Sequence, residues 1–109
     1  MYSINGNDIT LTRGDSMFVD LTLTKDGEAF TPEEGSSIRF AMKKKYTDAD
    51  STALVINIPI DTLRLAVEPD DTKSYQMGKT YVYDIQYTDA SGNVDTFISG
   101  TLTLTEEVI

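Results

Sequence analysis

The sequence contains no cysteine and no histidine. Without cysteine, the chain has neither a disulfide framework nor a thiolate metal site. Without histidine, it lacks the commonest general base, the usual zinc ligand and the usual pH switch. Serine and threonine are abundant, but no histidine or Ser-x-x-Lys arrangement is present to activate a hydroxyl as a nucleophile. We therefore expect no enzymatic activity, no cofactor and no metal.

Basic residues are also scarce. Nine lysines and arginines stand against 18 aspartates and glutamates, which gives a formal net charge of −9. Because cationic contacts dominate binding to a phosphate backbone, we expect no nucleic-acid partner. No apolar run reaches the length of a membrane span, and the first eight residues, MYSINGND, lack the features of a signal peptide. We expect no membrane partner, no signal peptide and a cytoplasmic site of synthesis.

The pattern that is present is strand-like alternation, most clearly over Thr80–Thr105. On one side of a predicted turn at Asp89–Asn93, aromatic and aliphatic residues alternate with polar ones. The inward set is Tyr81, Tyr83, Ile85 and Tyr87 before the turn, and Val94, Thr96, Ile98, Gly100, Leu102 and Leu104 after it. Gly100 predicts a bulge or a close backbone approach. Phe97 falls on the polar face, where it is either covered by a loop or exposed to a partner.

Five further strands are predicted upstream by the same alternation. They cover Ile9–Thr12, Met17–Thr24, Ser37–Lys43, Leu54–Ile60 and Leu63–Val67. Pro59 predicts that the fourth of these strands lies at a sheet edge or ends there, and Asp61-Thr62 is expected to be a hairpin turn. Pro69–Tyr75 is expected to form a short helix or 3₁₀ turn, and Phe30 a plug. Seven strands over residues 1–109 predict one all-β domain, an antiparallel sandwich.

Short charged segments offer several candidate sites, and each also has a purely structural interpretation. Arg13-Gly14-Asp15 matches a cell-adhesion tripeptide, but glycine is also expected where one strand turns into the next. Lys43-Lys44-Lys45 is either a solvated strand end or an electrostatic contact for a partner. The acidic pairs Asp48/Asp50 and Asp70/Asp71 lack the spacing of a calcium loop, which favours solvated acidic loops.

Three tyrosines of the predicted hairpin form another candidate site. Tyr81, Tyr83 and Tyr87 are either a stacking platform for sugar rings or a core stripe whose hydroxyls reach the sheet margin. Their alternation with polar residues favours the core stripe.

Two segments carry a resemblance to a known family. One is Ile9–Ser16 (ITLTRGDS) with the strand and Lys25-Asp26-Gly27 turn that follow; the other is Gly78–Tyr87 (GKTYVYDIQY) with Gly92 and Phe97–Leu104 (FISGTLTL). Together with Ile38-Arg39-Phe40 and Val67–Asp70, they resemble the N-terminal domain of upper baseplate proteins from tailed phages and prophages of Gram-positive bacteria. The resemblance runs from about Asp8 to Thr105.

The resemblance implies an immunoglobulin-like sandwich of about seven strands that docks one virion component onto another. Family members often continue into a helical linker and a distal receptor-binding domain, whereas this sequence stops after its last strand. We therefore expect a small structural subunit of a tail baseplate, assembled in the host cytoplasm and carried in the virion tail. Its expected partners are other baseplate proteins or further copies of itself. The rival hypothesis is a carbohydrate-binding or adhesion module of the same fold.

The expected contact residues lie on turns, loops and the solvent side of the last strand. They are Arg13, Asp15, Lys43, Lys44, Lys45 and Phe97. Immunoglobulin domains carry a tyrosine near the start of their sixth strand whose hydroxyl bonds back across a corner. The resemblance assigns this structural role to Tyr81, and it places Tyr83 where such domains often have a core cysteine.

Overall fold

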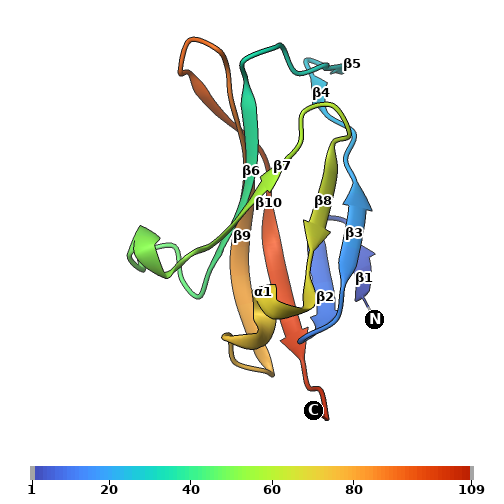
Figure 1. Ribbon diagram of the computed structural model, residues 1–109, viewed down its shortest axis with the longest axis vertical. Helices are drawn as coiled ribbons and strands as arrows, with labels where there is room; N and C mark the ends of the chain where they lie inside the picture. Colours follow the sequence, from blue (N-terminus) through green and yellow to red (C-terminus); the bar gives the residue numbers. More distant parts are fainter. Residues whose placement is uncertain (1, 109) are drawn as a thin grey trace.

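The computed structural model describes residues 2–108 as an all-β sandwich with one short helix (Figure 1). The elements in chain order are β1 (Tyr2–Asn5), β2 (Asp8–Thr12), β3 (Met17–Asp20), β4 (Thr24–Lys25), β5 (Glu28–Ala29), β6 (Ser37–Lys43), the 3₁₀ turn η1 (Asp50–Thr52), β7 (Leu54–Ile58), β8 (Arg64–Val67), α1 (Pro69–Lys73), β9 (Lys79–Thr88) and β10 (Val94–Thr105).

Two sheets form the layers of the sandwich. The large sheet has the strand order β1-β2-β10-β9-β6-β7, and the small sheet pairs β3 with β8. Most neighbouring strands are antiparallel, as the sequence predicts, but β2 and β10 run parallel, with Ile9 opposite Leu102. The expectation of purely antiparallel sheets is therefore wrong at this pair. Alternation reports which face a side chain occupies, and it carries no information on the direction of the neighbouring strand.

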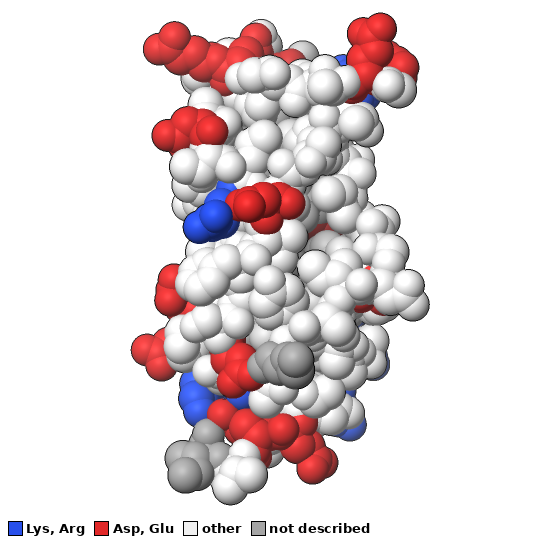
Figure 2. Space-filling view, turned by 90° about the vertical axis from the view of Figure 1, so that its right-hand side faces the viewer, with Lys and Arg blue, Asp and Glu red and all other residues white. Residues whose placement is uncertain are grey.

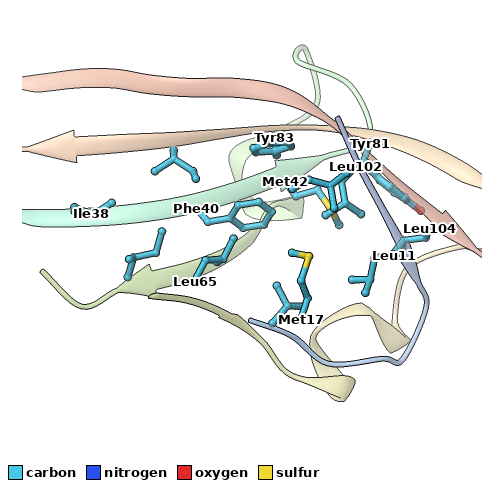
Figure 3. Packing of buried hydrophobic residues seen from close by; sticks show 14 of the residues in the cluster. Leu11, Met17, Ile38, Phe40, Met42, Leu65, Tyr81, Tyr83, Leu102 and Leu104 are labelled. Carbon is cyan, nitrogen blue, oxygen red and sulfur yellow. The ribbon is translucent and has the colours of Figure 1, made fainter. Parts of the chain in front are cut away.

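The core lies between the two sheets and consists of the predicted inward positions. Phe40, Met42 and Tyr83 project from the large sheet, and Met17 and Leu65 from the small sheet, as Figure 3 shows. The ring of Phe40 stacks on that of Tyr83 with 5.3 Å between centroids. The buried hydrophobic residues form one cluster that spans both sheets. The chain thus has a single core, with apolar burial as its main stabilising term.

The β9–β10 hairpin is confirmed as the centre of the large sheet. Its turn is closed by Asp89, whose carboxylate accepts hydrogen bonds from the backbone N–H groups of Ser91 and Asn93, each at 2.9 Å. The bond from the Asn93 backbone is the main cause that lowers the pKa of Asp89. The residues of the turn are those whose side chains bond back to their own backbone, which explains why this turn is predictable.

A β-bulge between Thr96 and Ile98 changes the facing of residues in β10. The sequence places Val94 inward and Phe97 on the polar face, but Val94 is 55% exposed and Phe97 packs against the core. The inward placement of Val94 is therefore wrong, because one extra residue on a strand reverses the facing on one side of it. Gly100 is not the bulge. It marks the close approach instead, since a Cβ there would lie 2.2 Å from the carbonyl oxygen of Asn7.

The segment between β7 and β8 differs from the expected hairpin. β7 belongs to the large sheet and β8 to the small sheet, so Asp61-Thr62 lies in a crossover between layers. Leu63 adopts a φ of 53° at the end of this crossover, and its N–H donates to the carbonyl oxygen of Pro59 at 2.9 Å. Two adjacent strand patterns cannot distinguish a turn within a sheet from a step between sheets. Pro59 follows β7 at the edge of the large sheet, as predicted.

The expected strand Met17–Thr24 is shorter in the structure. β3 ends at Asp20, and a separate two-strand ladder, β4–β5, is closed by Asp26-Gly27 with φ angles of 54° and 80°. Positive φ at both central residues is the signature of a tight Asp-Gly hairpin turn. The helix prediction for Pro69–Tyr75 is confirmed by α1, with Pro69 in its first turn and the Asp71 carboxylate accepting a hydrogen bond from the Glu68 N–H at 2.7 Å.

Candidate functional site

The Arg13-Gly14-Asp15 turn is bound into the fold by contacts with α1 and the end of the chain. The Arg13 guanidinium donates through Nη1 to Glu107 Oε1 at 2.8 Å, and through Nη2 to the carbonyl oxygen of Lys73. Lys73 Nζ lies 2.9 Å from Glu107 Oε2, so one carboxylate joins two cations. The Gly14 N–H donates to Thr72 Oγ1 at 2.8 Å, and Thr72 is the buried polar residue of α1.

Gly14 explains why this turn has its sequence. Its φ is 84°, and a Cβ at this position would lie 2.6 Å from Glu107 Oε2. Any other residue would be strained and would push the Glu107 carboxylate away from its cations. The geometry thus accounts for the tripeptide as a clamp between β2, α1 and the chain end. The roles of Glu107 and Thr72 in this contact were not predicted from the sequence. The sequence offered one signal for it, an acidic residue after β10 and a basic residue after β2.

The lysine run divides into one structural residue and two exposed ones. Lys43 Nζ donates to the carbonyl oxygen of Asp48 at 3.0 Å and to Asp50 Oδ1 at 2.9 Å, and it also reaches the carbonyl oxygen of Tyr46. The hydrogen bond from Lys43, followed by its charge, lowers the pKa of Asp50. Lys44 and Lys45 are exposed on the loop. Lys43 therefore fixes the loop over residues 44–53 to the end of β6.

A hollow of about 480 Å³ lies on the outer face of the large sheet beside this loop. It forms where the short side chain of Ala41 sits between the longer Arg39 and Lys43 on the same strand. Arg39 Nη1 and Asp84 Oδ1 form an ion pair at 2.6 Å across the floor. Tyr46, which is 67% exposed, contributes to the wall. The hollow thus combines an aromatic ring with paired charges of both signs. It was not predicted from the sequence.

Phe97 lies in an aromatic cluster and is only partly accessible. Its ring stacks on Phe30 with 5.4 Å between centroids, and Phe30 meets Tyr87 edge-on at 4.9 Å. Of the two predicted roles for Phe97, cover by a neighbouring loop is the one observed, because Phe30 belongs to the loop after β5. Tyr81, Tyr83 and Tyr87 are each at most 6% exposed, so the stacking-platform interpretation of these tyrosines is wrong and the core stripe is observed.

The hydroxyls of two of these tyrosines bind backbone at the sheet margin. The Tyr81 hydroxyl accepts a hydrogen bond from the Gln76 N–H at 2.9 Å and donates to the Gln76 carbonyl oxygen at 3.1 Å, five residues upstream. The Tyr83 hydroxyl donates to the carbonyl oxygen of Asn7 in the β1–β2 turn at 2.6 Å. Burial first, and then the nearby Asp8 charge, raises the pKa of Tyr83.

The acidic pairs do not converge into a site. Within residues 2–108, no group of three or more acidic residues is placed to hold a metal ion. Asp50 pairs with Lys43 and Asp71 with the backbone of α1, so both carboxylates have structural partners.

The edge strand β1 is the surface that sequence reasoning missed. All four of its residues are exposed, and Tyr2 and Ile4 keep 40% and 45% of their area accessible. They lie opposite Leu11 and Ile9 of β2, both buried, so they extend the core face of the large sheet past the small sheet. The Tyr2 hydroxyl donates to the carbonyl oxygen of Phe18 on β3 at 3.0 Å. A four-residue run with two polar positions is too short to predict as a strand.

No protein-family model matches the chain, and comparison with curated proteins and with solved structures finds no match. In the part of the chain that the structure describes, no helix has the length and apolarity needed to cross a bilayer.

Proposed function

We propose that this protein is a non-enzymatic structural subunit of a phage or prophage tail baseplate, and that it acts through contacts between proteins. Two arguments support the proposal. One is the resemblance over Asp8–Thr105, and the other is the open edge of the large sheet at β1. Because one fold serves many functions, the sandwich alone does not carry the proposal.

The strand order supports the immunoglobulin-like part of the proposal. In variable-type immunoglobulin domains, one sheet contains strands G, F, C and C′, while strands B and E lie in the other sheet. Here β10, β9, β6 and β7 are consecutive in the large sheet, and β3 pairs with β8 in the small one. The two sets correspond in order.

Tyr81 supports the same part independently. Tyr81 is the third residue of β9, the strand that corresponds to strand F of an immunoglobulin domain. Its hydroxyl forms hydrogen bonds with the backbone of Gln76, just upstream. Tyr83 occupies the core two residues later, where many immunoglobulin domains have cysteine. This tyrosine pair is a local feature that the resemblance requires.

The open β1 edge is the observation that carries the assembly role. An edge strand exposes unpaired N–H and C=O groups, and another chain can extend the sheet along it. The candidate contacts Lys44, Lys45 and Asp15 lie elsewhere, on the loop after β6 and the turn after β2. Of these positions, Lys44 and Lys45 are exposed and offer a second candidate surface.

Purified tail particles test this function directly. Particles should be prepared from the strain that encodes the chain, and their proteins measured by quantitative mass spectrometry. The chain is expected at a fixed ratio to the other tail proteins, and its gene beside genes for a tape-measure protein, holin or lysin. A chain that is expressed but absent from intact particles would overturn the proposal.

The hollow beside the loop over residues 44–53 favours a second candidate function, binding of a neutral carbohydrate. A sugar ring can stack its apolar face on an exposed aromatic such as Tyr46, while its hydroxyls bond the Arg39–Asp84 pair. A glycan array probed with the isolated chain tests this function. Binding that is lost in Tyr46→Ala and retained in Thr47→Ala, a neighbouring exposed position, would support it, and a blank array would exclude it.

A further inference from the structure

We infer that the β1 edge pairs with β1 of a second copy of this chain, joining two large sheets into one continuous sheet across a twofold axis. The inference rests on the assembly role proposed above and names the partner for one of its surfaces. Three features support it: β1 has no residue that blocks pairing with another strand, its register with a second β1 is self-complementary, and the strand carries no charge.

The β1 edge lacks the devices that normally prevent pairing. Natural edge strands are blocked by proline, lysine, inward charges or bulges. β1 reads Tyr-Ser-Ile-Asn, with no proline and no charge, and its pairing with β2 has no break in register. Within residues 2–108, no strand pairs along its outer side. A second strand therefore meets no obstacle in the sequence of this edge.

The backbone alternation selects the residues that would bond to the second copy. β1 and β2 are joined by the two-residue turn Gly6-Asn7, which closes on the pair Asn5–Asp8. In such a hairpin the closing pair exchanges both of its hydrogen bonds, and every second residue does the same. Asn5 and Ser3 thus point their backbone groups at β2. Tyr2 and Ile4 point theirs outward, toward the open edge.

One twofold register satisfies both the backbone and the side chains. When the axis passes through Ser3, Tyr2 of each copy lies opposite Ile4 of the other, and Ser3 lies opposite Ser3. Tyr2 and Ile4 are the residues with outward backbone groups, so each of the two pairs exchanges two hydrogen bonds. The same register places an aromatic beside a β-branched side chain, a favourable cross-strand pair, on the face where both are now exposed.

Charge on β1 itself does not oppose a second copy, because none of its four residues is charged. Each copy carries a net charge of −9, so two copies repel one another wherever acidic residues meet. Figure 2 looks onto the side of the molecule that carries β1 and β3. Its acidic atoms are most concentrated at the two ends, and between them a basic and an acidic group lie side by side, with further acidic atoms along one margin. Phe18 on β3, which is 47% exposed, adds apolar area next to Tyr2.

The short length of β1 sets the expected strength of this contact. Four residues per copy form few bonds and bury less surface than a standard interface, so the isolated pair is weak. We expect reversible dimers with a dissociation constant of about 10 μM to 1 mM, and stronger association at higher salt because screening reduces the repulsion of the acidic copies.

Disulfide trapping tests the register. The chain has no cysteine, so Ser3→Cys introduces a single thiol on the twofold axis. Residues in a non-hydrogen-bonded pair lie about 4.5 Å apart between Cα atoms, which is within the range of a disulfide. We expect Ser3→Cys to form a covalent dimer under mild oxidation. The matched control is Thr10→Cys, exposed and directly opposite Ser3 but one strand further from the axis, which should not form the covalent dimer.

Sedimentation equilibrium tests the association without a cross-link. Ile4→Lys places a charge on the edge and should weaken dimerisation at least about ten-fold. Val55→Lys, the same change at an exposed position of the opposite edge strand β7, should leave it unchanged. A wild-type chain that stays monomeric up to about 1 mM would overturn the inference, as would equal cross-linking of Ser3→Cys and Thr10→Cys.

Tail particles then separate this inference from the function on which it rests. If the chain is present in particles but monomeric in solution and not cross-linked through Ser3→Cys, the baseplate role stands and the inference of a β1 dimer fails. If the chain dimerises through β1 but is missing from particles, the dimer stands and the baseplate role fails.

Discussion

The two edges of the large sheet are treated differently by the fold. At β7 the residues facing the core become more buried along the strand and end with Ile58 at 3% exposure, and Pro59 follows. At β1 all four residues are exposed, and neither proline nor charge limits pairing. β7 also lies against β8 of the small sheet, although the two strands are not paired. The comparison indicates that one edge belongs to the core and the other is left for contact with another molecule.

Substitution of one isoleucine at each edge should give the largest difference. Ile58→Ala removes a fully packed side chain and should lower the free energy of unfolding by about 2–5 kcal/mol. Ile4→Ala, at 45% exposure, should lower it by less than about 1 kcal/mol. Urea unfolding at low protein concentration, where the chain is monomeric, measures both. Equal losses would show that β1 is as much a part of the core as β7.

Gly100→Ala should break the packing of β10 against the β1 side of the sheet. The new Cβ would lie 2.2 Å from the carbonyl oxygen of Asn7, which is backbone and cannot rotate away. We expect a loss of about 1–3 kcal/mol and displacement of the β1–β2 turn. Urea unfolding gives the loss, and amide exchange of residues 2–8 locates it. Ser99→Ala, an exposed neighbour, should stay within about 0.5 kcal/mol of the parent chain.

Tyr83→Phe should loosen the same turn by a smaller amount. It removes the hydrogen bond to the carbonyl oxygen of Asn7 but keeps the ring that stacks on Phe40. The expected loss is about 1 kcal/mol, the usual net contribution of one such bond. Faster amide exchange confined to β1 and β2 would show that this hydroxyl anchors the open edge. Uniformly faster exchange would contradict that role.

The raised pKa of Tyr83 predicts an alkaline loss of stability. Burial disfavours the phenolate in the folded state, so the folded-state pKa lies above the unfolded value of about 10. Stability is therefore complete below about pH 10 and falls as the pH rises above it, because the unfolded chain releases this proton first. Urea midpoints between pH 9 and 11 measure the effect. Tyr83→Phe should show a shallower decline, and an identical slope would refute this assignment.

Near the β7 edge the smallest effect is expected from Asp50. Its pKa is lowered first by the hydrogen bond from Lys43, so the contact persists above the ordinary carboxylate pKa and is lost as the pH falls through the lower, folded-state value. Carboxyl chemical shifts followed by NMR should place its midpoint below the ordinary aspartate value. In Lys43→Met the midpoint should return to the ordinary value, with little change in overall stability.

The faces of the strands were largely predictable from the sequence. In β6, β8 and β9 the alternation identifies the buried side chains correctly, because each strand packs one face on a single core. The alternation fails in β10, where the bulge before Ile98 reverses the facing of Val94. An extra residue leaves no compositional mark, since the flanking residues still alternate in type.

Which strands lie next to one another was much less predictable than which face of a strand is buried. The step from β7 to β8 looked like a hairpin, and the parallel partner of β2 lies about 90 residues away in β10. The same limit applies to the candidate contact residues Arg13 and Lys43. Their ion-pair partners within the chain are set by the tertiary structure and could not be predicted from the sequence. A charged side chain in a turn gives no sign of whether its counter-ion is another part of the chain or another molecule.

The position of β10 between β2 and β9 has a consequence for synthesis on the ribosome. Among the strands of residues 2–108, the hairpin β1–β2 comes first along the chain, and its neighbour on the inner side of the sheet is β10, which comes last. Until that strand arrives, Leu11 and Ile9 have no adjacent strand on that side, and joining them closes a very long loop. During synthesis the β1–β2 hairpin therefore remains without its neighbouring strand until β10 is complete. The net negative charge of the chain helps to keep nascent chains apart during that interval.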